Sequence, residues 1–364
     1  MNAGIIQNTE ELLNSLRAFD ADESVEGIGV FAAEKTAPDS SEIDPTLRNL
    51  STPVFGGVFP EVIYRGKKFD AGTIVFLLRT APTVSVISGL SDPTSDFSEQ
   101  LPDAVPTRGT AFVFVDAFAS RVETLISELF NTYGVDCNYL GGGAGSLSME
   151  QQPCLFTNQG LVVDGAVFAT VDIETTIGVR HGWQKVDGPF QVTDATDRKL
   201  ETLEETPAFE LYRQVVEEDA SLELNRKNFF EIAKMYPFGI SRLDGEDIVR
   251  DPYEVTDDGG LCCFGDIPEG EFLHILKGDP DDLVSAAKAA YTAASSNSTD
   301  EVLFFDCISR VLYLEDAFTR ELEAVGGETG PAIGALTIGE IANDSQGHLD
   351  YYNKTAVAAV TDDL

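Results

Sequence analysis

The sequence predicts an α+β fold made of two layered α/β sandwich domains with mixed, largely antiparallel sheets. A chain of 364 residues is long enough for about two domains. Its 43% content of hydrophobic residues can fill real cores and argues against disorder. Apolar runs of strand length are mixed with amphipathic helical stretches, and short turns separate many successive strands. This pattern favours α+β layers over a doubly wound parallel sheet.

Residues 1–23 form a lead-in with one expected helix, Asn8 to Phe19. Asn8 is a good N-cap, and Glu11 stands three residues later, as in a capping box. Apolar residues then recur at helical spacing along one face.

Residues 24–205 are the first expected domain. It contains a short helix within Ser40–Leu50 and a longer helix that begins at Ser120, where Ser120 and Glu123 form a capping box. Gly134 ends that longer helix. The expected strands are Gly27–Phe31, Pro53–Gly57, a hairpin of Val62–Tyr64 with Gly72–Leu78, Ala111–Asp116, and an antiparallel pair of Cys154–Thr157 with Gly160–Ile173. Ser91–Thr110 is expected to be a loop and Gly141–Gly145 a tight turn.

Residues 206–364 are the second expected domain, reached through an acidic stretch, Asp187–Glu205, that we interpret as a linker. Thr206 caps the next helix and Pro207 occupies its first turn, where a missing N–H costs nothing. The other expected helices are Lys227–Met235, Asp279–Ala294 and Val311–Val325. The expected strands are Phe238–Ser241, Gly260–Gly265, Glu271–Leu276, Val302–Cys307, Ala332–Ile341 and Ala356–Val360.

The formal net charge of −38 comes from 62 acidic residues against 24 Lys and Arg, spread along the whole chain. Such a surface indicates a halophilic protein, as in a haloarchaeon, because at about 1 M salt the Debye length is only about 3 Å and self-repulsion is screened. The same charge argues against binding to nucleic acid or insertion into an anionic membrane, since no cationic face is present.

Several features predict a cytoplasmic location. The five Cys residues are odd in number and contain no C-x-x-C pair, which fits a reducing compartment. The N-terminus lacks the basic start and apolar core of a signal peptide. No apolar run reaches the length of about 18 residues that a membrane span needs.

Several different short motifs follow one another along the chain. The first half ends in the stretch Gly178–Trp183 (GVRHGW), and the second opens on Thr206-Pro207-Ala208. The later motifs are Pro237–Ile240, Asp266–Gly270, Cys307-x-x-Arg310, Gly339-Glu340 and Asn353-x-Thr355. In this order the chain resembles the FIST family (F-box and intracellular signal transduction proteins) over about residues 24 to 360.

The resemblance implies an N-terminal FIST domain at 24–205, a C-terminal FIST domain at 206–364, and a role as a sensor of a small ligand, with amino acids proposed for the family. It also implies an alternative, since some members bind haem and sense nitric oxide. We expect a stand-alone sensor that binds its ligand between the two domains and signals through a separate partner, such as a histidine kinase or a transducer.

Arg310 and Glu340 are the first candidates for contact with a ligand. Arg310 lies between a strand and an apolar helix in a chain that has few cations, and its planar fork suits a carboxylate. Glu340 could receive an ammonium group, so the pair would suit an amino acid. The alternatives are a structural ion pair for Arg310 and a solvent-exposed edge charge for Glu340.

Further candidates follow Arg310 and Glu340. Asn353 and Thr355 offer neutral hydrogen bonds or simply close a turn. Cys307 is either a small buried residue or a reactive thiol, although no His is near it in sequence. Gly142 and Gly143 let a backbone approach closely, and we include them as pocket-lining candidates.

Arg180 is a further candidate for contact with the small ligand, and His181 beside it is the candidate for the haem alternative. The competing interpretation is a hydrogen-bonded His at a strand end, packed on Trp183. No two His residues have metal-ligand spacing, and we expect no metal and no cofactor unless haem is bound. The sequence contains no Ser–His–Asp set and no nucleotide loop, so we do not expect an enzyme.

Overall fold

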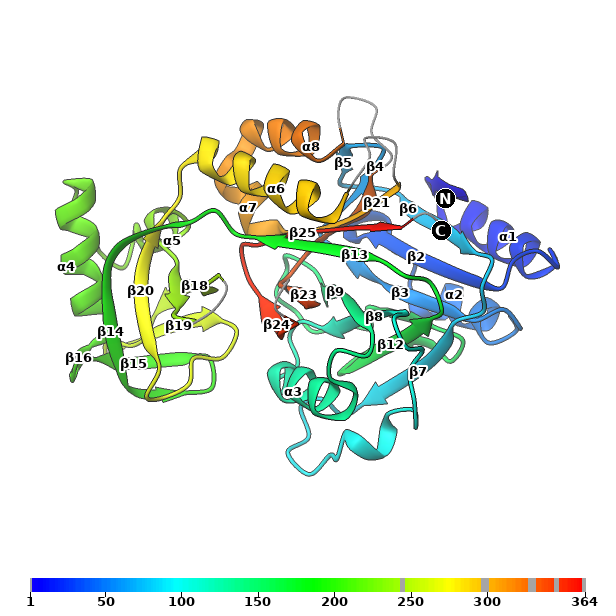
Figure 1. Ribbon diagram of the computed structural model, residues 1–364, viewed down its shortest axis with the longest axis horizontal. Coiled ribbons are helices and arrows are strands. Elements are labelled where there is room, and N and C mark those ends of the chain that lie inside the picture. The colour runs from blue at the N-terminus through cyan, green and yellow to red at the C-terminus, as the bar shows by residue number, and fades with distance from the viewer. Residues whose placement is uncertain (1, 243–245, 296–300, 327–331, 344–346, 362–364) are drawn as a thin grey trace.

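A barrel stands beside a larger body of stacked sheets and helices (Figure 1). The computed structural model describes residues 2–242, 246–295, 301–326, 332–343 and 347–361. Within them, three six-stranded sheets build the body and a seven-stranded sheet builds the barrel. Helices and mixed, largely antiparallel sheets confirm the α+β class predicted from the sequence.

The first sheet of the body has central strands that are buried on both faces. Its strands, in spatial order, are β1 (Asn2–Ile6), β6 (Thr73–Leu78), β2 (Gly27–Ala33), β3 (Val54–Phe59), β10 (Leu155–Thr157) and β11 (Gly160–Val162). Helices α1 (Thr9–Asp20) and α2 (Ser40–Leu47) accompany it. The predicted cap of α1 is confirmed, because the Glu11 N–H donates to Asn8 Oδ1 at 2.9 Å.

The second sheet packs against the first through a cluster of phenylalanines. Phe31 of β2 lies 5.5 Å, centroid to centroid, from Phe114 of β8. The strands are β24 (Leu349–Tyr352), β23 (Glu340–Asn343), β9 (Asn138–Ala144), β8 (Thr110–Asp116), β12 (Gly165–Val171) and β7 (Thr83–Ser88). Helix α3 (Val122–Tyr133) covers its other face and contacts β24.

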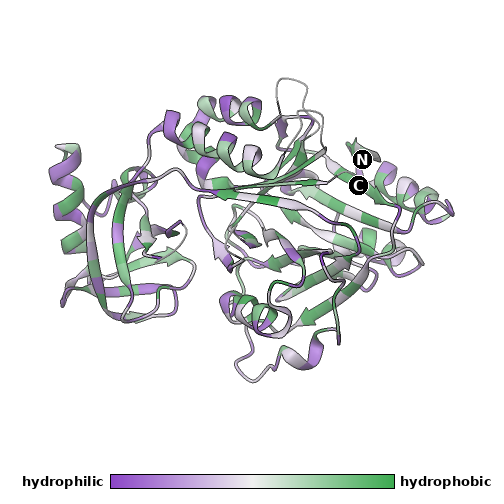
Figure 2. Ribbon diagram, in the orientation of Figure 1, coloured by the Kyte–Doolittle hydropathy of each residue, from purple (hydrophilic) through white to green (hydrophobic). Residues whose placement is uncertain are grey.

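The third sheet carries a layer of helices on its outer face (Figure 1). Its strands are β13 (Thr176–Arg180), β25 (Ala356–Thr361), β21 (Glu301–Cys307), β22 (Ile333–Thr337), β4 (Glu61–Tyr64) and β5 (Lys67–Phe69). The covering helices are α6 (Pro280–Ala294), α7 (Ile308–Leu314) and α8 (Phe318–Gly326). In Figure 2 the strands of the body are mostly apolar, whereas the outer helices alternate apolar and polar faces.

The barrel closes because β14, at one end of the sheet, pairs with its neighbour β20 and also with β15 near the other end. The strand order is β14 (Gln184–Thr196), β20 (Phe272–Lys277), β17 (Phe238–Ile240), β18 (Ile248–Val255), β19 (Leu261–Phe264), β15 (Lys199–Leu203) and β16 (Thr206–Pro207). A further β14–β15 pairing completes the ring. Helices α4 (Ala208–Ala220) and α5 (Phe229–Ala233) accompany it.

Three strand–helix–strand units repeat within the body, each with a parallel pair: β2–β3, β8–β9 and β21–β22. Each second strand carries a glycine against the first, namely Gly56, Gly141 and Gly334. A Cβ on any of them would lie 1.9, 2.0 or 1.7 Å from the carbonyl oxygen of its partner in the first strand. Only glycine permits so close an approach of two backbones.

The sheets join residues from both sides of position 205. In the second sheet β9 pairs with β23, and in the third sheet β4 pairs with β22 and β13 with β25. The unit that stands apart in space is the barrel, residues 184–242 and 246–277, whereas the body combines segments from both ends of the chain (Figure 1).

Some expected elements differ from the structure. The hairpin partner of β4 is β5, while β6 pairs with β1 and β2 in the first sheet. The expected linker Asp187–Glu205 instead forms β14 and β15, because a barrel strand with one exposed face needs few apolar residues. The Gly141–Gly145 run lies largely within β9 and is not a turn.

Helix boundaries also differ from the prediction. Helix α4 begins at Ala208 with Pro207, and not Thr206, as its N-cap and with no side-chain cap bond. Helix α3 begins at Val122, and its N-cap is Arg121, which makes no side-chain cap bond. Glu123 does not complete a capping box but accepts a hydrogen bond from the Asp266 N–H of the barrel at 2.7 Å. The expected helix Val311–Val325 is two helices, α7 and α8, separated at Glu315, whose φ is +49°.

Candidate functional site

A pocket of about 360 Å³ lies between the barrel and the body, within the size range of small-molecule sites. The barrel contributes Phe230 of α5, Tyr253 of β18 and Phe264 of β19. The body contributes Leu147, Met149, Cys307, Ile308, Ser309, Leu312, Ile338, Gly339 and Asn353. The pocket therefore combines segments that lie far apart in the sequence.

The segment Ile338-Gly339 forms one wall because it breaks the strand that the sequence predicts from Ala332 to Ile341. Gly339 has φ +86°, and the chain passes there from β22 in the third sheet to β23 in the second. The Gly143 N–H donates to the Gly339 carbonyl at 2.8 Å, and the Ile338 N–H donates to the Gly143 carbonyl at 2.9 Å.

The predicted pocket-lining residues Gly142 and Gly143 therefore lie behind this wall and not in it. A Cβ on Gly143 would come within 2.1 Å of the Ile338 carbonyl oxygen, and one on Gly142 within 2.6 Å of the Gly339 carbonyl oxygen. The two glycines shape the pocket indirectly, because the absence of a Cβ allows the β9 backbone to pack closely against Ile338-Gly339.

Cys307 lines the pocket, and Glu340 is fully buried behind it. The Glu340 carboxyl accepts hydrogen bonds from Thr337 Oγ1 at 2.8 Å and from the Thr355 N–H at 3.2 Å, and it also hydrogen-bonds the Cys307 thiol. Burial raises the pKa of Glu340 to about 8. Burial, with Glu340 adding to the effect, also raises the pKa of Cys307 well above its usual range, so the thiol stays protonated and is a poor nucleophile.

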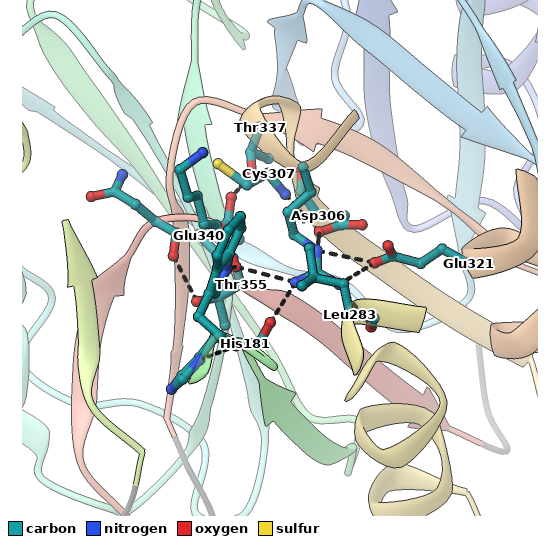
Figure 3. Close-up of polar contacts among 12 residues, drawn as sticks. His181, Leu283, Asp306, Cys307, Glu321, Thr337, Glu340 and Thr355 are labelled. Carbon is teal, nitrogen blue, oxygen red and sulfur yellow. Dashed lines mark hydrogen bonds and ion pairs between the residues drawn. The ribbon is translucent and has the colours of Figure 1, made fainter. Parts of the chain in front are cut away.

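Arg310, in α7, is fully buried and does not line the pocket. It forms ion pairs with Asp306 at 3.1 Å and Glu321 at 2.6 Å (Figure 3). Its N–H groups reach Glu321 Oε1 and the main-chain oxygens of His181, Leu283 and Lys354. All five donors of the guanidinium thus have protein acceptors, and none is left for the carboxylate of a ligand.

Lys354 is a buried cation that the sequence analysis did not select. Its Nζ lies 3.2 Å from Asp251 Oδ2, donates to the Lys234 carbonyl at 3.0 Å, and sits 5.0 Å from the centroid of the Trp183 ring. Because Asp251 lies in β18 of the barrel and Lys234 directly follows α5, whereas Lys354 follows β24, this lysine connects the barrel to the body. It is the middle residue of the motif Asn353-x-Thr355. Its burial could not be predicted from the sequence, because lysine side chains are mostly exposed.

Asn353 and Thr355 have different positions. The Thr355 hydroxyl donates to the Asn353 carbonyl at 2.7 Å, so Thr355 closes the turn that holds Asn353. The Asn353 side chain lines the pocket, and the residue is only 2% exposed. Its Oδ1 has no hydrogen-bond partner among the described residues.

His181 and Arg180 do not line this pocket. His181 Nδ1 accepts a hydrogen bond from the Trp183 N–H at 2.9 Å, and its Nε2 lies 3.5 Å from Glu246. Burial lowers the pKa of His181. Arg180 Nε lies 3.4 Å from the same Glu246. The contacts of His181 match the structural interpretation, a hydrogen-bonded His beside Trp183.

The described part of the chain contains no group of three or more His, Cys, Asp or Glu side chains placed to hold a metal ion. Among the helices of those residues, none is long and apolar enough to cross a membrane.

Comparison with known protein families gives two matches. The family model of the FIST N domain matches residues 28–206, and that of the FIST C domain matches residues 208–343. None of the curated proteins compared with the chain matches it.

Proposed function

The chain belongs to the FIST family, and from this premise we propose that it is a signal-transduction sensor whose small ligand occupies the pocket between barrel and body. FIST domains are signal-transduction domains. The observation that carries the proposal is that the pocket walls come from both units. A ligand that fills the pocket contacts both at once.

Such a ligand would bias the docking of the barrel on the body. It can shift that equilibrium only by its difference in affinity for the docked and undocked arrangements, and a ligand touching both units has such a difference. The changed docking would then be read by a separate partner, for which a histidine kinase or a transducer remains our proposal. We propose no catalytic activity and no metal.

The ligand assignment changes from the amino acid that the resemblance implies. An amino acid held by Arg310 and Glu340 would need a free guanidinium, but all five donors of Arg310 are bonded within the protein. Haem bound by His181 stays an untested alternative. A Soret band after haem reconstitution, lost in His181→Ala, would support it.

Thermal unfolding in 3 M KCl with a panel of the twenty amino acids and neutral aromatic compounds tests the proposal. A ligand at a hundred times its Kd should stabilise the protein by about 2.7 kcal/mol. Leu312→Trp fills the pocket mouth and should abolish the shift, whereas Val163→Trp, at a similarly exposed position that does not line the pocket, should retain it. A shift that persists in Leu312→Trp, or no shift with any compound, would contradict the proposal.

A further inference from the structure

We infer that the pocket between barrel and body takes an uncharged, largely apolar small molecule carrying one N–H or O–H donor, and that Asn353 Oδ1 accepts that donor. This inference rests on the proposed function and adds the chemical class of the ligand. Three properties of the pocket carry it: its lack of charge, its inventory of polar atoms and the exposure of its rim.

No lining residue of the pocket carries a charge, although the chain contains 62 acidic residues. Two buried ionisable groups that hydrogen-bond lining residues, Asp251 and Glu340, are already partnered. Asp251 is paired with Lys354, and Glu340 accepts hydrogen bonds from Thr337 and Thr355. A charged ligand would lose its hydration on entry and meet no opposite charge, which is unfavourable in an apolar site.

The polar side chains of the lining are also engaged, with one exception. Ser309 hydrogen-bonds Asp251, Tyr253 hydrogen-bonds Cys262, and Cys307 hydrogen-bonds Glu340. The exception is the Oδ1 of Asn353, a side-chain acceptor that has no partner among the described residues although the residue is more than nine-tenths buried. A buried acceptor without a donor costs free energy, so a ligand with one donor gains affinity by supplying it.

The apolar rim of the pocket is partly exposed. Leu147, Met149, Phe230 and Leu312 are between 39% and 47% exposed, and they include most of the exposed large hydrophobic residues of the described chain. Burial of apolar surface favours binding. An apolar ligand would cover this surface, and a small polar one would leave it in water.

A matched series of indole compounds tests the inference on the full chain by calorimetry in 3 M KCl. Indole has an apolar body and one N–H donor, and 1-methylindole has the same body without the donor. Indole-3-acetate, tryptamine and tryptophan add a negative charge, a positive charge and both charges. We expect indole to bind tightest, and 1-methylindole to bind about tenfold more weakly.

The variant Asn353→Leu removes the acceptor by replacing the amide with an apolar side chain of similar size. It should bring the indole and 1-methylindole affinities together, with its fold checked by circular dichroism. If the variant does not fold, the ratio of the two affinities in the wild-type protein still decides whether a donor is recognised.

Equal binding of indole and 1-methylindole to the wild-type protein, or tighter binding of a charged compound, would overturn the inference. If that charged compound is excluded by Leu312→Trp, the proposed function stands and only the ligand class fails. If none of the five compounds binds up to its solubility limit, the inference is wrong, and the amino-acid panel then decides the proposed function separately.

Discussion

Arg310 and Lys354 are scarce cations that this acidic chain places in its interior. Each is fully buried, and each connects segments that are distant in the sequence: Arg310 reaches His181, Leu283 and Glu321, and Lys354 reaches Asp251. The scarcity of cations made Arg310 a candidate from sequence. In the structure Arg310 forms buried ion pairs with Asp306 and Glu321, which is the structural alternative that the sequence left open.

Arg310→Met tests this structural role. The substitution leaves Asp306 and Glu321 as buried acids without their cation, so the free energy of unfolding should fall by about 3–5 kcal/mol. Arg320→Met is the control, since the Arg320–Asp281 pair is solvent-exposed and should contribute less than about 1 kcal/mol. Denaturant unfolding in 3 M KCl measures both, and equal small losses would contradict the role assigned to Arg310.

Glu340→Gln tests the raised pKa of this buried carboxyl. Because its folded pKa of about 8 exceeds its ordinary value of 4.5, the folded state holds a proton that the unfolded state releases between those pH values. The stabilisation is complete below about pH 4.5 and is lost as the pH rises through 8.

Unfolding measured from pH 5 to pH 9 should show wild-type stability falling relative to Glu340→Gln, by up to about 1.4 kcal/mol per pH unit. Glu218→Gln, at an exposed position, should keep the wild-type slope. A Glu340→Gln profile parallel to wild type would show that this carboxyl ionises normally.

At the scale of elements, apolar periodicity located most strands and helices but not their partners. Runs such as Gly27–Phe31 and Val302–Cys307 could be recognised as strands, because buried strands appear in the sequence as continuous apolar runs. Strand β14 was missed because its polar face hides the alternation. Pairings such as β9 with β23 join residues about 200 positions apart, and no local pattern encodes them.

Gly141→Ala tests the close strand pairs that repeat through the body. The new Cβ would lie 2.0 Å from the Val113 carbonyl oxygen, so β8 and β9 would have to separate. We expect a loss of about 3 kcal/mol or more in the free energy of unfolding. Gly4→Ala, in β1 with nothing within 4 Å of its Cβ, should change stability far less. Similar losses in the two variants would refute the requirement for glycine.

At the scale of the whole molecule, the sequence predicted part of the site. Cys307 and Asn353 line the pocket, whereas Glu340, Gly142 and Gly143 support its wall from behind. The barrel residues of the pocket were missed, because Phe230, Tyr253 and Phe264 look like ordinary core positions in sequence. Their placement depends on how the barrel docks, which no spacing of residues reveals.

The charge of −38 makes a prediction for the molecule as a whole. In molar salt the acidic surface is screened, and in 0.1 M KCl the Debye length is about 10 Å, so repulsion acts across the protein. We expect partial unfolding, seen as a loss of circular dichroism signal, between 3 M and 0.1 M KCl. An unchanged spectrum would contradict the halophilic interpretation.

Hydrogen–deuterium exchange tests most directly whether the space between barrel and body is the ligand site. The full chain would be compared with and without the panel compound that stabilises it most. Protection is predicted in residues 146–150, 229–231, 307–312 and 338–340, which come from both units. Protection confined to residues 176–183 around His181, or to one face of the barrel alone, would contradict the account.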